Sequence, residues 1–139
     1  MFRVMARVFK IKAFARDARK AKIADAELCR VARKAEKGQF HADYGGGVIK
    51  TKLNKALHRG LILMKAGDKS VFALLFAKKD RENITSKEED ALKVLAGIYA
   101  AMDDAGLKKA LDSGEVVEID CPADDDDDDE DEDDGETGS

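Results

Sequence analysis

The stretch Gly45-Gly46-Gly47-Val48-Ile49-Lys50-Thr51-Lys52-Leu53 decides the fold of this chain. Its three glycines give the backbone the freedom that a turn into a strand requires. The residues that follow alternate between the two sides of a strand, with Ile49, Thr51 and Leu53 on one side and Val48, Lys50 and Lys52 on the other. No helix follows the glycines and no Lys-Ser/Thr pair comes directly after the last of them, which excludes a nucleotide-binding loop.

Two apolar runs follow this strand at residues 59–65 and 69–77. The short connection Ala66-Gly67-Asp68 predicts that they form a β-hairpin. Because both runs are apolar on both faces, we expect them in the middle of the sheet.

A helix is predicted after the hairpin, because Ser86 and Glu89 have the spacing of a capping box. Residues 107–111 are expected to add a short helical turn, and residues 115–119 alternate like a last edge strand. The side chains that the main helix should bury are Leu92, Leu95, Tyr99 and Met102.

The N-terminal half predicts a strand at residues 3–10 and then two helices joined by few residues, which favours an antiparallel hairpin. Asp25 is a candidate cap for the second helix, and Gly38 ends it. The helical spacing of apolar residues is seen in Ile11, Phe14, Ala15 and Ala18, and again in Leu28, Val31, Ala32 and Ala35.

The predicted order is therefore β-α-α-β-β-β-α-β, an α+β domain with an antiparallel sheet at residues 1–123. Residues 124–139 contain no Val, Ile, Leu or aromatic residue, and we expect a disordered polyacidic tail. The Arg- and Lys-rich first 22 residues also fit a transit peptide, but they run without a break into folded-looking sequence. Met5 is a second candidate start.

The net charge of −4 conceals two opposite regions. Residues 124–139 hold 12 of the 29 acids and no base, which leaves 25 Lys and Arg against 17 acids in the rest of the chain. The excess lies in residues 1–82, with 21 bases and 8 acids. A concentrated positive field on a small domain is typical of a protein that binds a polyanion.

Cys29 and Cys121 are too few and too far apart to predict a disulfide framework or a metal site, so we expect two reduced thiols in a cytoplasmic protein. No apolar run reaches the roughly 20 residues of a membrane span. We therefore expect no membrane association, no metal and no cofactor.

Several phrases carry a resemblance to a known family. They are Ile23-Ala24-Asp25-Ala26-Glu27-Leu28, Ala35-Glu36-Lys37-Gly38, Asp43-Tyr44-Gly45-Gly46-Gly47-Val48-Ile49-Lys50, residues 76–84, Ala91-Leu92-Lys93 and residues 114–119. Through them, residues 5–119 resemble the RelE/ParE toxins of bacterial toxin–antitoxin systems, and most of all the RelE-like, HigB-type branch. The acidic tail lies outside the resemblance.

The resemblance implies a RelE-like fold, with an N-terminal helical hairpin packed on an antiparallel sheet and a C-terminal helix. It also implies an endoribonuclease that enters the ribosomal A site, cleaves mRNA with Lys and Arg instead of a histidine pair, and is neutralised by a cognate antitoxin. One segment departs from the family pattern. Members of this branch have a longer Gly/Lys/Ser-rich loop ending in Tyr-Arg, where this chain has only residues 54–60, with His58 before Arg59.

Cleavage of RNA by its own 2′-hydroxyl requires a base, stabilisation of the phosphorane and an acid for the leaving oxygen. Lys50 and Lys52 leave the same face of a strand, and crowding among cations lowers the pKa of a lysine. We therefore predict a catalytic set in which Lys52 is a better candidate for general base than Lys50, Arg59 and Arg81 contact the phosphate and transition state, and His58 is a possible acid. RNA contacts are expected from Lys55, Lys78, Lys79, Tyr44, Arg16 and Arg19.

Alternatives remain open at this point. A non-catalytic RNA- or ribosome-binding descendant of the same fold would use the same face without the chemistry. A ParE-like gyrase inhibitor would need none of these residues. The tail either provides solubility or folds back on the cationic face as a built-in RNA mimic.

Overall fold

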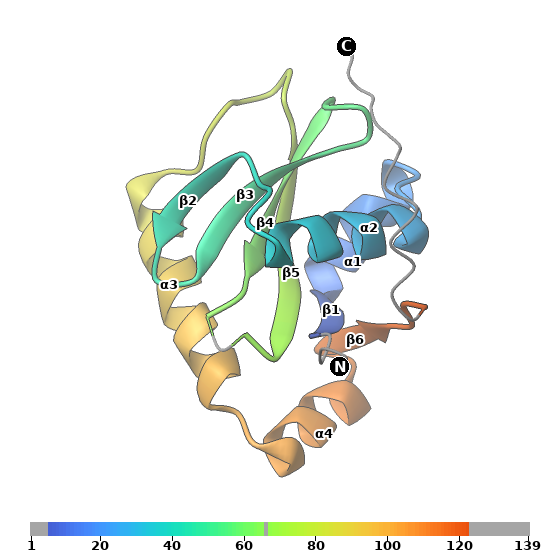
Figure 1. Cartoon of the computed structure of the whole chain (residues 1–139), viewed down its shortest axis with the longest axis vertical. Helices are drawn as coiled ribbons and strands as arrows, with labels where there is room; N and C mark the ends of the chain where they lie inside the picture. The colour runs from blue at the N-terminus through green and yellow to red at the C-terminus, as the bar shows by residue number, and fades with distance from the viewer. Residues whose placement is uncertain (1–5, 66, 123–139) are drawn as a thin grey trace.

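The computed structural model describes residues 6–65 and 67–122 and consists of one sheet with helices on both faces (Figure 1). The strands are β1 (Arg7–Ile11), β2 (Ala42–Gly45), β3 (Val48–Leu53), β4 (His58–Leu63), β5 (Lys69–Ala77) and β6 (Val116–Ile119). The helices are α1 (Lys12–Lys20), α2 (Asp25–Glu36), α3 (Ser86–Ala101) and α4 (Asp104–Ser113). The predicted tail, residues 124–139, lies outside the described residues, and so do residues 3–5 of the first predicted strand.

The strand order is β2-β3-β4-β5-β1-β6, which confirms that β4 and β5 lie in the middle and β6 at an edge. All neighbouring strands are antiparallel except β1 and β5, which are parallel. The predicted α+β fold with an antiparallel sheet is confirmed, and β1–β5 is its one parallel pair among the described strands. Its reason is topological, since the first strand enters between β5 and β6 instead of extending the β2–β5 meander.

Two apolar clusters fill the two faces of the sheet. Helices α1 and α2 cover one face, where Phe14 and Leu28 pack against Ile49 and Phe72 of the strands. Helices α3 and α4 cover the other face, where Leu92 and Tyr99 lie in a cluster with Phe9, Val48 and Leu61. The alternation of β3 is therefore borne out, because consecutive residues of this strand serve opposite layers.

The helix boundaries differ from the prediction in their caps. Thr85, not Ser86, caps α3: its side chain accepts a hydrogen bond from the Glu88 N–H, and the Glu88 carboxylate accepts one from the Thr85 N–H. Asp25 is the first residue of α2 and does not cap it; its carboxylate instead accepts a 2.7 Å hydrogen bond from Lys10. Residues 107–111 form part of a longer helix, α4, which Asp103 caps.

The prediction of two reduced thiols was also wrong, because a disulfide joins Cys29 and Cys121 with their Cα atoms 5.6 Å apart. The 92 residues between them in the sequence hide this proximity. Strand β6 pairs with β1 and leads the chain back toward α2, so the sheet topology brings the two sulfurs together.

Gly45 ends β2, and Gly46 and Gly47 form the turn into β3; all three glycines have positive φ. Gly47 has the tightest surroundings. A Cβ atom placed on it would lie 2.6 Å from the Lys65 Cα, because the Met64 N–H donates a 2.7 Å hydrogen bond to the Gly47 carbonyl. No side chain fits between these two backbones.

We predict that Gly47→Ala lowers the free energy of unfolding by about 3 kcal/mol or more, because a left-handed conformation and a backbone clash add together. The matched control is Gly38→Ala, since Gly38 has φ +88° but no atom within 4 Å of a new Cβ. It should cost only about 1 kcal/mol. Urea unfolding of both variants measures the difference, and equal costs would contradict the close approach at Gly47.

Candidate active site

The register of the central strands gathers three predicted cations on the α3 face of the sheet. Lys50 and Lys52 share a face of β3, and Lys52 lies directly opposite Arg59 of β4. Arg59 in turn lies opposite Phe76 of β5. Phe76 belongs to the apolar cluster under α3, which identifies the face.

Lys50 is the most enclosed of these cations, with only 5% of its surface exposed. Its ammonium donates hydrogen bonds to Asn83 Oδ1 at 2.6 Å and to the Glu82 carbonyl at 3.2 Å. Burial, and then the charge of Arg59, lower the pKa of Lys50. The lowered lysine pKa that the sequence predicts is therefore found at the buried Lys50, while Lys52 is exposed.

Arg59 is equally buried, at 4% exposed, and holds the shortened loop between β3 and β4. Its Nη1 donates to the carbonyls of Ala56 at 2.9 Å and His58 at 3.2 Å, while its Nε is buried without a hydrogen-bond partner in the described structure. The loop contains three consecutive residues with positive φ, namely Asn54, Lys55 and Ala56. Such backbone is strained outside glycine, so Arg59 helps to maintain a conformation that the sequence does not favour by itself.

Arg81 lies above Phe76, with its guanidinium carbon 4.6 Å from the ring centroid. Both of its Nη atoms donate to the carboxylate of Glu88, at 2.8 Å and 3.0 Å. Arg81 and then the Thr85 N–H lower the pKa of Glu88 to about 2. The guanidinium is thus fixed over the sheet beside the start of α3, and its partner is neither Asp80 nor Glu82.

His41 was not predicted from the sequence and lies beside the same cations. The backbone N–H of His41 donates a 2.8 Å hydrogen bond to the Lys50 carbonyl, so His41 lies beside β3, just before β2 begins. Partial burial of its ring, and then the charges of Lys52, Lys50 and Arg59, lower the pKa of His41. An isolated histidine in a polar segment gave no indication of this role, because only strand pairing brings it to the lysines.

Tyr44 adds an aromatic surface to this face. The Lys50 ammonium lies 6.0 Å from its ring centroid, at the outer limit of a cation–π contact. Its hydroxyl is buried without a hydrogen-bond partner in the described structure. Burial, and then the charge of Glu89, raise the pKa of Tyr44, so the phenol is a neutral donor at neutral pH.

The structure does not bring His58 to this face. His58 lies opposite Leu53, which belongs to the apolar cluster under α1 and α2, so its side chain leaves the other face of the sheet. There its Nδ1 lies 3.2 Å from the Asn54 amide nitrogen. Arg16 and Arg19 are exposed on α1, also on that side.

The remaining predicted RNA contacts gather at one end of the sheet. Lys55 is exposed in the β3–β4 loop, and Lys78 and Lys79 are exposed just after β5. The Lys78 N–H donates a 2.9 Å hydrogen bond to the Leu57 carbonyl, which joins the two loops. They form the end of the sheet drawn at the top of Figure 1.

Comparison with known proteins identifies the family of the chain. The family model described as "RelE toxin of RelE / RelB toxin-antitoxin system" matches residues 6–119. The chain belongs to the RelE toxin family. Searches of the curated proteins and of the solved structures gave no significant match. RelE membership implies that a cognate antitoxin exists for this toxin.

The described residues of this RelE protein show neither a membrane-spanning helix nor a metal-binding cluster. No helix within them is long and apolar enough to cross a bilayer. No three His, Cys, Asp or Glu side chains among them are placed to hold a metal ion.

We predict that the Arg81–Glu88 pair makes stability depend on acid pH. The folded-state pKa of Glu88 is about 2, below its ordinary value of 4.5, so its contribution is present above pH 4.5 and is lost as the pH falls toward 2. Glu88→Gln should cost about 1 kcal/mol at pH 7, a figure reduced for partial solvent exposure, and should flatten this pH dependence.

Denaturant unfolding from pH 7 to pH 2 measures both effects. Asp112→Asn is the matched control, because its ion pair with Lys108 is largely exposed on α4. It should change stability little. An unchanged pH slope in Glu88→Gln would show that the pair does not act as described.

Proposed function

We propose that this RelE-family toxin inhibits translation as a ribosome-dependent mRNA endonuclease that cuts RNA by attack of the adjacent 2′-hydroxyl. One observation carries the proposal: Lys50, Lys52 and Arg59 share one face of the sheet, and the backbone N–H of His41 is bonded to the Lys50 carbonyl at the edge of that site. Arg81 lies over the neighbouring Phe76 and extends the positive surface toward α3.

The cations suit the phosphorane step, in which negative charge develops on the oxygens of the scissile phosphate. Lys52 is exposed on the same face as the buried Lys50 and Arg59, and it can meet a phosphate directly. Two buried donors, Arg59 Nε and the Tyr44 hydroxyl, lack protein partners.

His41 and Lys52 are the two candidates for general base. A lowered pKa leaves the imidazole of His41 mostly neutral at pH 7, the form that a general base needs. We therefore assign proton abstraction to His41 and phosphate contact to Lys52. His58 lies on the opposite face and has no place in this arrangement.

A second candidate function is RNA or ribosome binding without cleavage. It is favoured by the engagement of Lys50 with Asn83 and of Arg81 with Glu88, because these donors already have protein acceptors. Exposed cations such as Lys52 could still bind phosphate. Stabilisation of the transition state by Lys50 and Arg81 would be weaker, because these two side chains already bind protein acceptors.

We predict that purified protein cuts mRNA on programmed ribosomes and that His41→Gln slows cutting by about 10²- to 10⁴-fold, the effect expected for loss of a general base. Lys52→Ala should weaken cutting too, but the enzyme should keep its pH dependence. Mapping of mRNA 5′ ends over a pH series measures both. New ends and growth arrest should also appear on induced expression.

Lys108→Ala is the matched control, because Lys108 is an exposed cation on α4, far along the chain from the site. Thermal unfolding of each variant checks that the fold is retained. Ribosome binding without new mRNA ends would support the non-catalytic alternative. A pH profile unchanged by His41→Gln would remove His41 from the mechanism.

A further inference from the structure

The disulfide lies where the described chain runs into its acidic end. Cys121 follows β6, and Asp124, the first residue of the acidic run, comes three residues later. The bond fixes this point to Cys29 in the middle of α2. The root of the tail is therefore held on the α1–α2 side of the sheet, opposite the candidate active site.

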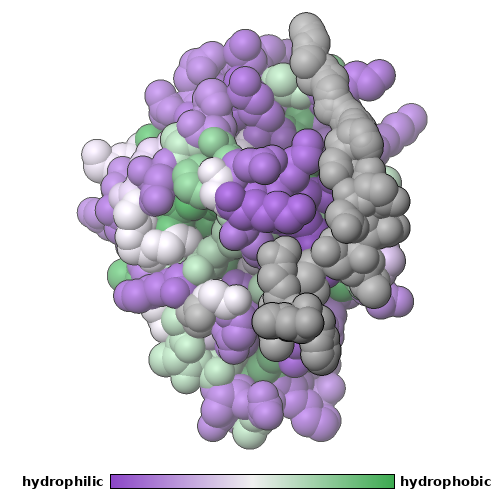
Figure 2. Space-filling view, viewed as in Figure 1, coloured by the Kyte–Doolittle hydropathy of each residue, from purple (hydrophilic) through white to green (hydrophobic). Residues whose placement is uncertain are grey.

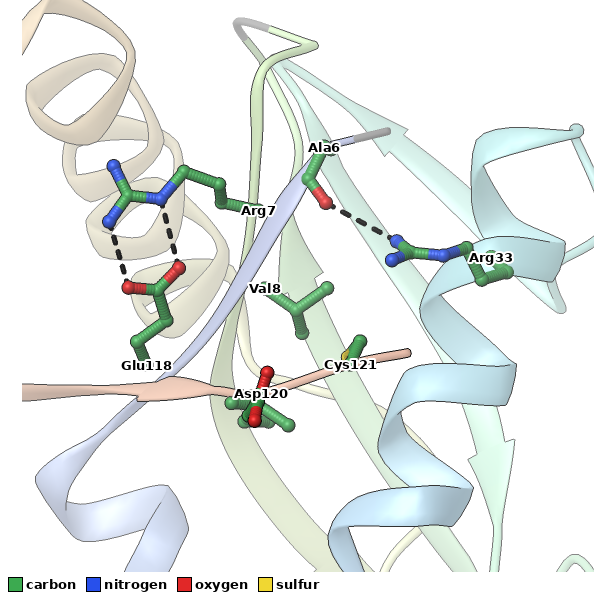
Figure 3. Close-up of a pocket in the computed structure, with 8 residues that line it drawn as sticks. Ala6, Arg7, Val8, Arg33, Glu118, Asp120 and Cys121 are labelled. Carbon is green, nitrogen blue, oxygen red and sulfur yellow. Dashed lines mark hydrogen bonds and ion pairs between the residues drawn. The ribbon is translucent and has the colours of Figure 1, made fainter. Parts of the chain in front are cut away.

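The bond is accessible to a small reductant from one side. Cys29 is 7% exposed, but Cys121 is only half-buried and lines an open cavity of about 450 Å³ (Figure 3). Arg33 of α2 lies across this cavity, where it donates a 3.2 Å hydrogen bond to the Ala6 carbonyl. The Arg7–Glu118 pair forms another part of the wall.

The outer face of α1 and α2 is cationic. Residues 12–37 contain nine bases and four acids. Figure 2 shows hydrophilic side chains over much of the side of the molecule on which these helices lie. We give the name hairpin face to the exposed bases of this segment, which are Lys12, Arg16, Arg19, Lys20, Lys22, Arg30 and Lys37.

Among the described residues, the hairpin face has few acids to neutralise it. Asp17 lies 3.7 Å from Arg16, Asp25 is paired with Lys10, and the Glu27 carboxylate accepts a hydrogen bond from the Asn54 N–H. Arg30 directly follows Cys29 in the sequence, so unpaired positive charge begins beside the bond itself.

We infer that the Cys29–Cys121 bond is a redox-sensitive latch that directs the acidic tail, residues 124–139, onto the hairpin face. Twelve acids and no base are complementary to that surface. The tail is long enough, because each extended residue spans about 3.3–3.6 Å while the 12 residues of α2 span about 18 Å. Holding the root in place raises the local concentration of tail carboxylates at these cations.

Release of the latch is a thiol–disulfide exchange with a dithiol reductant. A thiolate of the reductant attacks the accessible Cys121 sulfur, the S–S bond breaks and Cys29 leaves as a thiolate. The second thiol of the reductant then displaces Cys121 and closes a disulfide in the reductant. The protein gains two electrons and two protons, and the reductant loses them.

The consequence is a cationic surface whose availability depends on the redox state. In the oxidised protein the tail competes with other polyanions for the hairpin face, and after reduction its root is free to move away. The inference does not depend on RNA cleavage, since the hairpin face and the candidate active site lie on opposite sides of the sheet.

The test uses the full chain, oxidised or reduced, and carbodiimide cross-linking of carboxylates to lysine amines at low salt. Trypsin leaves residues 110–139 as one acidic peptide, because no Lys or Arg follows Lys109. Mass spectrometry then identifies the lysines joined to this peptide. We expect Lys20, Lys22 and Lys37 in the oxidised protein, with a several-fold loss on reduction, in Cys121→Ser and at high salt.

Three results would overturn the inference. Alkylation of both cysteines without prior reduction, after mild oxidation, would show that no bond forms. Cross-links of equal yield in oxidised and reduced protein would show that the disulfide does not direct the tail. Cross-links mainly to Lys50, Lys52 and Lys79 would place the tail on the active-site face instead. Reduced wild-type protein provides the comparison if Cys121→Ser does not fold.

Discussion

The alternation of β3 is the constraint on which the rest of the structure depends. Because successive side chains of a strand leave opposite faces, Ile49 and Leu53 must serve the core under α1 and α2, while Val48 serves the core under α3. Because Lys50 and Lys52 alternate with these residues, their side chains must lie on the α3 face. A slip of one residue would exchange the two sets and bury lysines beneath the helical hairpin.

That arrangement places charge where apolar side chains usually pack. Lys50 and Arg59 are each about 95% buried, and a buried cation is tolerated only when hydrogen bonds replace its water. Asn83 and backbone carbonyls accept these bonds. The two cations are therefore held in position, and their side chains can move less. Lys52 and His41 remain on the surface. In the proposed mechanism the enclosed cations give electrostatic support and the exposed groups contact the substrate.

Much of the fold could be predicted because it follows from local patterns. Strand β3 and the central position of β4 and β5 follow from periodicity. Other features depend on three-dimensional proximity or on closely spaced alternatives. Thr85/Glu88 and Ser86/Glu89 fit a capping box equally well, and β2 is only four residues long. The disulfide, the proximity of His41 to the lysines and the opposite orientation of His58 all depend on which strands pair.

The position of β1 also bears on how the molecule is made. This strand precedes the other strands in the chain, yet its neighbours in the sheet are β5 and β6, which begin only at residues 69 and 116. On the ribosome, the edge of β1 that pairs with β6 therefore stays unpaired until residue 119 has left the exit tunnel. The meander of β2 to β5 can form earlier because its pairings are local. Completion of the sheet is thus a late event in vectorial synthesis, and a truncated chain would lack the strand that covers its own beginning.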